Sequence, residues 1–224
     1  MTAAPRSAFA PGRFRLLLLA LLLLIVGTAA ATWAGATRLI EVIFVAIALG
    51  VAVLELRAPG QRRLIPVTLA ASVILVSLAD YTVPLGHLPL LASAIVAIFS
   101  AIVIWLAYGS VMRPHRPVGD RIVGAICVYL LIGLGWANVY ETLDGVIPGS
   151  FRFPAETAWA TASPLRYRYF SFVTLATLGY GDVTPITALA GTLAALEAIA
   201  GQLYIGITVA RLVALSLVDR ADSG

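Results

Sequence analysis

Long apolar blocks dominate this sequence and restrict what it can fold into. Hydrophobic residues make up 61% of the chain and charged residues only 12%, whereas ordinary globular domains carry roughly 25% charged residues. Most of the blocks approach or reach the length of about 20 residues that a helix needs to cross a bilayer. We therefore predict an all-α membrane protein embedded in a lipid bilayer, and we exclude a soluble domain.

We count six apolar blocks and predict that each is a transmembrane helix. Their approximate bounds are Phe14–Trp33, Leu39–Val53, Leu64–Leu78, Leu88–Tyr108, Ile122–Val139 and Ile186–Val218. The third block is short and barely reaches spanning length. The segment between the last two blocks, Tyr140 to Pro185, is neither a plain loop nor a seventh span.

The first block also has features of a secretory signal. An arginine-bearing start, a leucine run and the small residues from Thr28 to Ala31 are typical of such signals. The apolar run that starts at Leu16 is longer than the usual 7–15 residues or so, which favours a retained helix. Cleavage within residues 1–31 would leave the orientation of the later helices unchanged.

Arginine placement predicts the orientation of the helices, because short cytoplasmic loops are enriched in basic residues. One side of the predicted membrane holds Arg6, Arg13, Arg15, Arg57, Arg62, Arg63, Arg113, Arg116, Arg121, Arg211 and Arg220. The other side holds Arg38, Arg152, Arg166 and Arg168. We therefore expect both termini in the cytoplasm, a multi-pass protein of a plasma (inner) membrane, and a Tyr140–Pro185 segment that enters from outside. The net charge of +4 indicates no nucleic-acid partner, because the arginines flank membrane segments.

The sequence contains no pattern of residues that is typical of an enzyme. We find no nucleophile–base pair, metal-ligand cluster or phosphate-binding loop, and we expect no cofactor. The single Cys127 lies inside an apolar block, so no disulfide framework is predicted.

One short segment has a pattern suited to binding a bare cation. In Thr177-Leu178-Gly179-Tyr180-Gly181, glycine recurs at every second position. Glycine adopts positive φ without strain, and an alternating backbone points successive carbonyls to one side. Rings of carbonyl oxygens replace the hydration shell of potassium without the strong trapping that a carboxylate ring would impose. We predict that the carbonyls of residues 177–180 bind K⁺ and that the threonine hydroxyl adds a ligand.

The stretch from Tyr169 to Pro185 resembles the pore loop of potassium channels, and is closest to bacterial channels with one pore loop per chain. The resemblance rests on Thr-x-Gly-Tyr-Gly-Asp, at 177–182, between an aromatic-rich helix and a long apolar helix, and it covers roughly Ile122 to Leu217. It implies a potassium-selective channel with a re-entrant pore helix and a selectivity filter between the fifth and sixth transmembrane helices. One chain supplies one filter strand, so a closed ring requires a homotetramer.

This resemblance divides the chain into four parts. Residues 1–112 hold four helices in the position of a voltage sensor, 113–121 form a cytoplasmic linker, 122–218 form the pore domain, and 219–224 form a short cytoplasmic tail. The fourth helix contains no arginine or lysine, whereas voltage sensing requires charges that move through the field. We therefore expect no voltage sensor of the usual kind and no cytoplasmic ligand-binding domain.

Several residues outside the filter are candidates for its support. Ser163-Pro164 is a good start for the pore helix. The resemblance implies that Asp182 bonds to a group on that helix; Tyr169 is either its donor or an aromatic residue of the membrane interface. At Val173 some relatives have a carboxylate partner for the aspartate, and this version of the contact is absent. Glu197, an intramembrane carboxylate, either adds negative potential to the pore or forms a hydrogen bond behind the filter near Thr174.

The last helix is predicted to line the pore. Gly201 has the spacing of the hinge glycine of the family, although a small residue for close helix packing is the alternative. At helical period, Gln202, Ile205, Val209 and Val213 should face the pore. An aliphatic ring there can close a pore by dewetting.

Two other transport functions compete with this interpretation. The first is a poorly selective cation channel, because Leu178 stands where valine is commoner. The second is a potassium-uptake transporter, but those proteins resemble four fused pore loops with one filter glycine each, and this chain lacks that pattern.

Overall fold

The computed structural model describes residues 13–33, 43, 47, 88–112, 117–154 and 165–221. Within them the chain forms the helices α1 (Arg13–Trp33), α4 (Leu88–Val111), α5 (Val118–Val146), α6 (Leu165–Leu175) and α7 (Ala188–Ala221). Two strands of two residues each, β1 (Phe151–Arg152) and β2 (Thr184–Pro185), pair antiparallel.

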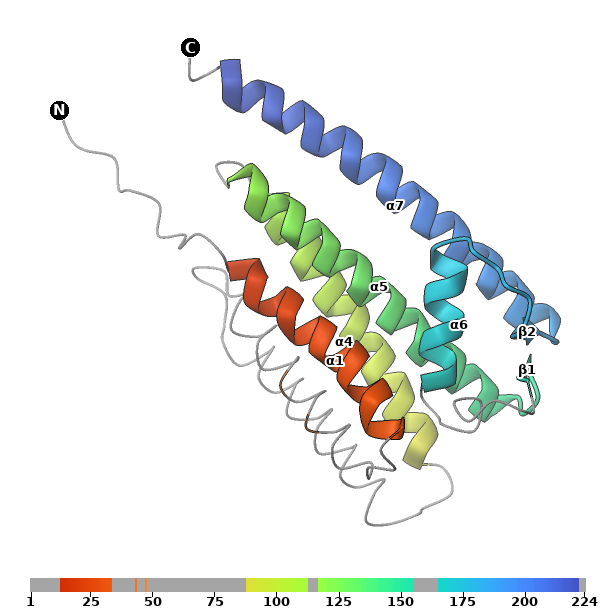
Figure 1. Cartoon of the computed structure of the whole chain (residues 1–224). Helices are drawn as coiled ribbons and strands as arrows, with labels where there is room; N and C mark the ends of the chain where they lie inside the picture. The colour runs from red at the N-terminus through yellow and green to blue at the C-terminus, as the bar shows by residue number, and fades with distance from the viewer. Residues whose placement is uncertain are drawn as a thin grey trace.

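The long helices run along one another, and the short helix α6 stands at an angle among them (Figure 1). Helices α1 and α4 both pack along α5, and α7 runs along the other side of α5. Helix α6 occupies the angle between α5 and α7 and spans only part of their length. The starts of α1 and α5 and the ends of α4 and α7 lie at the same end of the bundle.

Among the described residues, three stretches are long and apolar enough to cross a membrane: Phe14–Ala31, Val118–Val146 and Ala188–Leu217. A shorter apolar helical stretch covers Ser100–Val111. The described chain is thus that of an all-helical membrane protein. The second and third predicted spans lie outside the described residues apart from single positions, so the count of six remains a prediction.

Helix α5 is longer at both ends than its apolar block. It begins at Val118, so the end of the predicted linker 113–121 is helical. Pro117 precedes it as the N-cap residue, and Asp120 in the first turn interacts favourably with the helix dipole. At the other end α5 continues past the predicted Val139 to Val146, because the polar side chains there find partners on α6 and α7.

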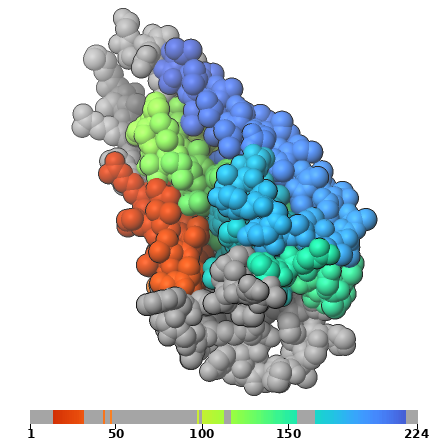
Figure 2. Space-filling view, turned by 45° about the vertical axis from the view of Figure 1, so that its right-hand side comes forward, coloured from red at the N-terminus to blue at the C-terminus, as the bar shows by residue number. Residues whose placement is uncertain are grey.

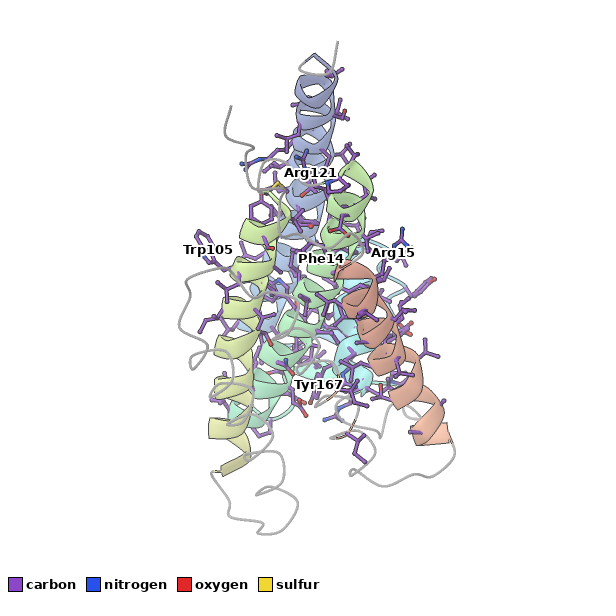
Figure 3. All side chains as sticks on the ribbon, turned by 90° about the vertical axis from the view of Figure 1, so that its left-hand side faces the viewer. Phe14, Arg15, Trp105, Arg121 and Tyr167 are labelled. Atoms are coloured by element: carbon purple, nitrogen blue, oxygen red, sulfur yellow. The ribbon has the colours of Figure 1, made fainter. Side chains whose placement is uncertain are left out.

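One core joins α1, α4 and α5. Its buried side chains include Phe14, Leu17 and Leu21 from α1, Val103, Ala107 and Val111 from α4, and Cys127 and Val128 from α5. A Cβ at Gly124 would lie 2.6 Å from Val111 Cγ2 and 3.0 Å from the Phe14 ring. A glycine is therefore what permits this close approach of helices, as is common between transmembrane helices. On the outside of this core Trp105 points away from the bundle and is 78% exposed (Figure 3).

A second, aromatic core holds α6 in place. The Tyr140 and Phe170 rings lie 5.0 Å apart and the Phe151 and Phe170 rings 5.3 Å apart, both edge to face, an arrangement that aromatic pairs prefer. Phe151 is also paired with Pro185 in the small sheet. The chain that follows residues 177–182 is thereby attached to the chain that follows α5. Figure 2 shows α6 beside α7, which forms one edge of the molecule.

Candidate functional site

The end of α6 places the Thr-x-Gly-Tyr-Gly segment. The helix closes with a tight turn in which the Thr177 N–H donates to the Thr174 carbonyl at 2.9 Å and the Leu178 N–H donates to the Val173 carbonyl at 2.9 Å. The predicted support residues Val173 and Thr174 thus contact the segment through their backbone. The predicted start of this helix, Ser163-Pro164, lies outside the described residues.

The backbone of the segment alternates as the glycine pattern predicts. Thr177, Gly179 and Gly181 have φ values of 56°, 55° and 79°. A Cβ added at Gly179 or Gly181 would meet nothing within 4 Å. Glycine is therefore required there for its backbone conformation and not for lack of space.

Thr177 has the same conformation without the freedom of glycine. A β-branched residue at positive φ is an outlier, and such strain of order 1–3 kcal/mol gathers at functional sites. In the part of the chain that the structure describes, no hydrogen bond involves the carbonyl oxygens of Thr177, Leu178, Gly179 or Tyr180. These oxygens are therefore available to bind a cation. An ordinary glycine turn would not need a row of such free carbonyl oxygens.

Tyr169 and Asp182 meet at the far end of the segment. The Tyr169 hydroxyl donates to Asp182 Oδ2 at 2.6 Å, and Asp182 Oδ1 accepts the Val183 N–H at 2.9 Å. Partial burial, followed by the hydrogen bond to Asp182, raises the pKa of the Tyr169 phenol to about 12, so the hydroxyl remains a donor at ordinary pH. Of the two interpretations of Tyr169, the structure supports the donor.

Glu197 lies behind the segment and is fully buried. Its carboxyl group contacts the Ser171 hydroxyl at 2.5 Å and accepts a hydrogen bond from the Tyr140 hydroxyl. Of the two alternatives for Glu197, the structure shows the hydrogen bond behind the segment, and its partner on α6 is Ser171, one helical turn before Thr174. Ser171 faces α7 because it lies on the buried face of α6, which also carries Phe170 and Leu175.

Two residues of α7 lie against the inner end of the segment. The Gln202 side-chain amide donates to Thr177 Oγ1 at 3.4 Å. A Cβ at Gly201 would overlap the Leu175 carbonyl oxygen and lie 2.9 Å from Leu175 Cδ1. Helix α7 continues without interruption through Gly201, so the structure supports the packing role of this glycine.

The predicted pore-lining residues occupy one stripe of α7. Gln202, Ile205, Val209 and Val213 are all exposed in the single chain. The adjacent stripe faces the other helices: Glu197, Gly201 and Thr208 are buried, and the Tyr204 hydroxyl donates to the Ala125 carbonyl of α5 at 2.7 Å. Other apolar residues of α7, such as Leu203 and Ile207, are exposed as well.

A polar cluster at the end of α5 was not predicted. Asp144 Oδ2 accepts a hydrogen bond from the Tyr167 hydroxyl at 2.6 Å and lies 3.6 Å from the Arg166 guanidinium. Its other oxygen accepts the Ser150 N–H at 2.9 Å. Burial and the bond to Asp144 raise the pKa of the Tyr167 phenol. Tyr167 points inward among the helices (Figure 3), and this cluster fixes the start of α6 to the end of α5.

The roles of Tyr140, Ser171 and Gly133 were also missed. A Cβ at Gly133 would overlap the Phe172 ring, so this glycine lets α6 approach α5. A usable signal existed for Tyr140 and Ser171, because an intramembrane carboxylate such as Glu197 needs polar partners. The sequence contains too many hydroxyl groups in these helices to identify which ones.

A comparison with protein families agrees with this geometry. A family model described as an ion channel matches residues 94–216, more than half of the chain. No curated protein and no solved structure matches the chain. The matched residues include the segment 177–182, its supporting helix α6 and the helix α7 up to residue 216. The chain therefore belongs to this ion channel family.

Proposed function

We propose that this chain is one subunit of a homotetrameric, potassium-selective channel that conducts K⁺ passively down its electrochemical gradient. The carbonyls of Thr177, Leu178, Gly179 and Tyr180 would bind the ion, with Gly181 and Asp182 at the outer mouth. The observation that carries the proposal is the alternating backbone of residues 177–181, whose carbonyls at 177–180 accept no hydrogen bond from the described residues. Carbonyl rings of this kind distinguish potassium from sodium.

The surroundings of the segment favour a cation. The C-terminal end of α6 carries roughly half a negative elementary charge from the helix dipole, and the segment starts there. Gln202 contacts the Thr177 hydroxyl, which orients this side chain for a further ligand position. In a tetramer four such helix ends would point at one central cavity.

Surface exposure supports assembly into a tetramer. One chain supplies only one strand of carbonyls, and its Leu178 and Tyr180 side chains are 58% and 67% exposed. Large apolar side chains in a membrane protein contact lipid or another helix, and an ion-conducting segment cannot face lipid, because its backbone groups would be unsatisfied there. We infer that neighbouring subunits cover these two residues.

The proposed channel lies in the plasma membrane with both termini in the cytoplasm. This orientation follows from the arginine distribution and agrees with the shared end of the bundle at which α1 and α5 start and α7 ends. The passive pore would open without a voltage sensor, since α4 contains no basic residue.

Ion flux out of liposomes loaded with potassium or sodium tests the proposal. Purified protein should release potassium at a rate at least tenfold above that of sodium, and chemical cross-linking in the same membranes should stop at the tetramer. Equal rates for both ions would favour the poorly selective channel instead. Cross-linking that stops at a dimer would contradict the fourfold ring.

A further inference from the structure

A group of hydroxyl and carboxyl oxygens joins α5, α6 and α7 behind the filter segment. Glu197 of α7 lies between Tyr140 of α5 and Ser171 of α6. Ser171 Oγ lies 2.5 Å from Glu197 Oε1 and also 2.7 Å from the Gly133 carbonyl oxygen of α5. We call Tyr140, Glu197, Ser171 and the Gly133 carbonyl the polar clasp.

Counting protons in the polar clasp fixes the charge of Glu197. The clasp has three short oxygen–oxygen contacts: Tyr140 to Glu197, Glu197 to Ser171, and Ser171 to Gly133. Each contact at hydrogen-bond distance requires one hydrogen between its oxygens. Each hydroxyl supplies one hydrogen and a backbone carbonyl supplies none, so the two hydroxyls satisfy only two contacts. The third hydrogen must belong to the Glu197 carboxyl group.

One arrangement then satisfies every contact. Tyr140 donates to Glu197 Oε2, the protonated Oε1 donates to Ser171 Oγ, and Ser171 donates to the Gly133 carbonyl. An ionised Glu197 would draw the Ser171 hydrogen to itself and leave two acceptor oxygens, Ser171 Oγ and the Gly133 carbonyl, facing each other at 2.7 Å.

The charged and titratable neighbours agree with a neutral Glu197. The Tyr140 phenol contacts it from α5 and the Ser171 hydroxyl from α6, and the Tyr129 phenol of α5 interacts with it electrostatically. The basic residues of α6 have other partners: Arg166 contacts Asp144, and Arg168 donates to the Thr28 hydroxyl at 3.1 Å. An ionised carboxylate in this fully buried place would lose its hydration without gaining a cationic partner among the described residues, which disfavours the charged form.

We propose that Glu197 carries a proton in the working channel and that Tyr140 and Ser171 are positioning residues, which hold the pore helix through this neutral clasp. Ser171 lies on α6, six residues before Thr177, so the clasp fixes the depth and rotation of the helix that ends at the filter. A neutral Glu197 adds no negative potential to the pore. The effect on the filter rests on the proposed function, whereas the proton on Glu197 rests on the contacts alone.

Glutamine is the matched replacement that separates these roles. The amide of Glu197→Gln can accept from Tyr140 with its oxygen and donate to Ser171 with its nitrogen, which preserves every contact without an ionisable group. Glu197→Ala removes the clasp and leaves the Tyr140 hydroxyl without its acceptor. If Glu197 acts as an anion, the glutamine variant should be as defective as the alanine variant.

Infrared spectroscopy and single-channel recording test the proposal on the full chain in bilayers. The spectrum of the natural chain minus that of Glu197→Gln should show the carbonyl stretch of a protonated carboxylic acid at neutral pH, and Tyr140→Phe should shift this band. Glu197→Gln should keep the potassium conductance within about twofold of the natural chain, and Glu197→Ala should lower selective flux at least tenfold. A difference spectrum with carboxylate bands only would overturn the proposal, as would a conductance in Glu197→Gln that falls as far as in Glu197→Ala. A chain that shows the protonated band but conducts no ions would instead refute the proposed function.

Discussion

Gly201 of α7 lies directly against the backbone carbonyl of Leu175, the last residue of α6. A Cβ at position 201 would overlap that oxygen, so no other L-residue fits without a shift of one helix. The filter segment begins two residues after Leu175, and any such shift would be passed to it. Close packing here therefore positions the proposed filter as directly as the side-chain hydrogen bonds do.

Gly201→Ala should consequently disturb the filter. The added methyl group collides with backbone rather than with a flexible side chain, and overpacking of this kind typically costs about 1–3 kcal/mol. We expect lower thermal stability of the assembled protein and a reduced potassium-to-sodium flux ratio. Gly191→Ala is the matched control, since it lies in the same helix and its Cβ would meet nothing within 4 Å. Equal behaviour of the two variants would refute this role of Gly201.

Tyr169→Phe removes the donor to Asp182 and leaves the ring in place. A hydrogen bond to a charged group contributes about 1.5–3 kcal/mol, with the lower end appropriate for this exposed pair. We expect potassium current that declines during sustained opening, because Asp182 is no longer held to α6. Recordings of current against time check this, with Tyr108→Phe on α4 as the control. If Asp182→Asn changes the rate of current decline by the same factor in the Tyr169→Phe chain as in the natural chain, the two residues are not coupled and the prediction is wrong.

Local backbone requirements were the most predictable part of the site. Glycines at every second position imply positive φ, and Gly179 and Gly181 have it. The family resemblance offered Tyr169 as the donor to Asp182, with an aromatic residue of the membrane interface as the alternative, and the structure shows this hydrogen bond. Both features depend on the local chain and on a recognisable motif.

Contacts between helices were much less predictable. Which residue of α6 contacts Glu197 depends on how α6 rotates against α7. No sequence pattern measures this rotation, so only the neighbourhood of Thr174 could be predicted and Ser171 could not be named. The role of Gly201 depends likewise on how closely α7 approaches the end of α6. The aromatic core around Phe151 requires a small sheet of two residues per strand, which is too short to leave a pattern in the sequence.

Opening should depend little on voltage. Each unit charge that crosses the field contributes about 2.3 kcal/mol per 100 mV, and α4 contains no arginine or lysine. We expect the open probability to change less than about tenfold between roughly −100 and +100 mV. Several sensor charges that crossed the field over this range would change it far more. A conductance–voltage curve with the steepness of several gating charges per subunit would contradict this.

Val209→Asn should raise the open probability if α7 forms a gate. Val209 and Val213 lie on the exposed stripe with Gln202, and a ring of aliphatic side chains excludes water from a narrow pore. A polar amide would hydrate that constriction. Cysteines at 209 and 213 report the closed state: slow modification from the cytoplasmic side supports the gate, and rapid modification of both places the gate at the filter.

The reversal potential in mixed potassium and sodium tests the central claim most directly. With potassium on one side of a bilayer and sodium on the other, the natural chain should give a reversal potential close to that of a potassium-selective membrane. Gly179→Ala forces alanine into the left-handed region at a cost of roughly 1–2 kcal/mol per chain, and it should abolish this selectivity while tetramers still assemble. Gly109→Ala on α4, where a Cβ meets nothing within 4 Å, should behave as the natural chain. A reversal potential near zero for the natural chain, or unchanged selectivity in Gly179→Ala, would contradict the account.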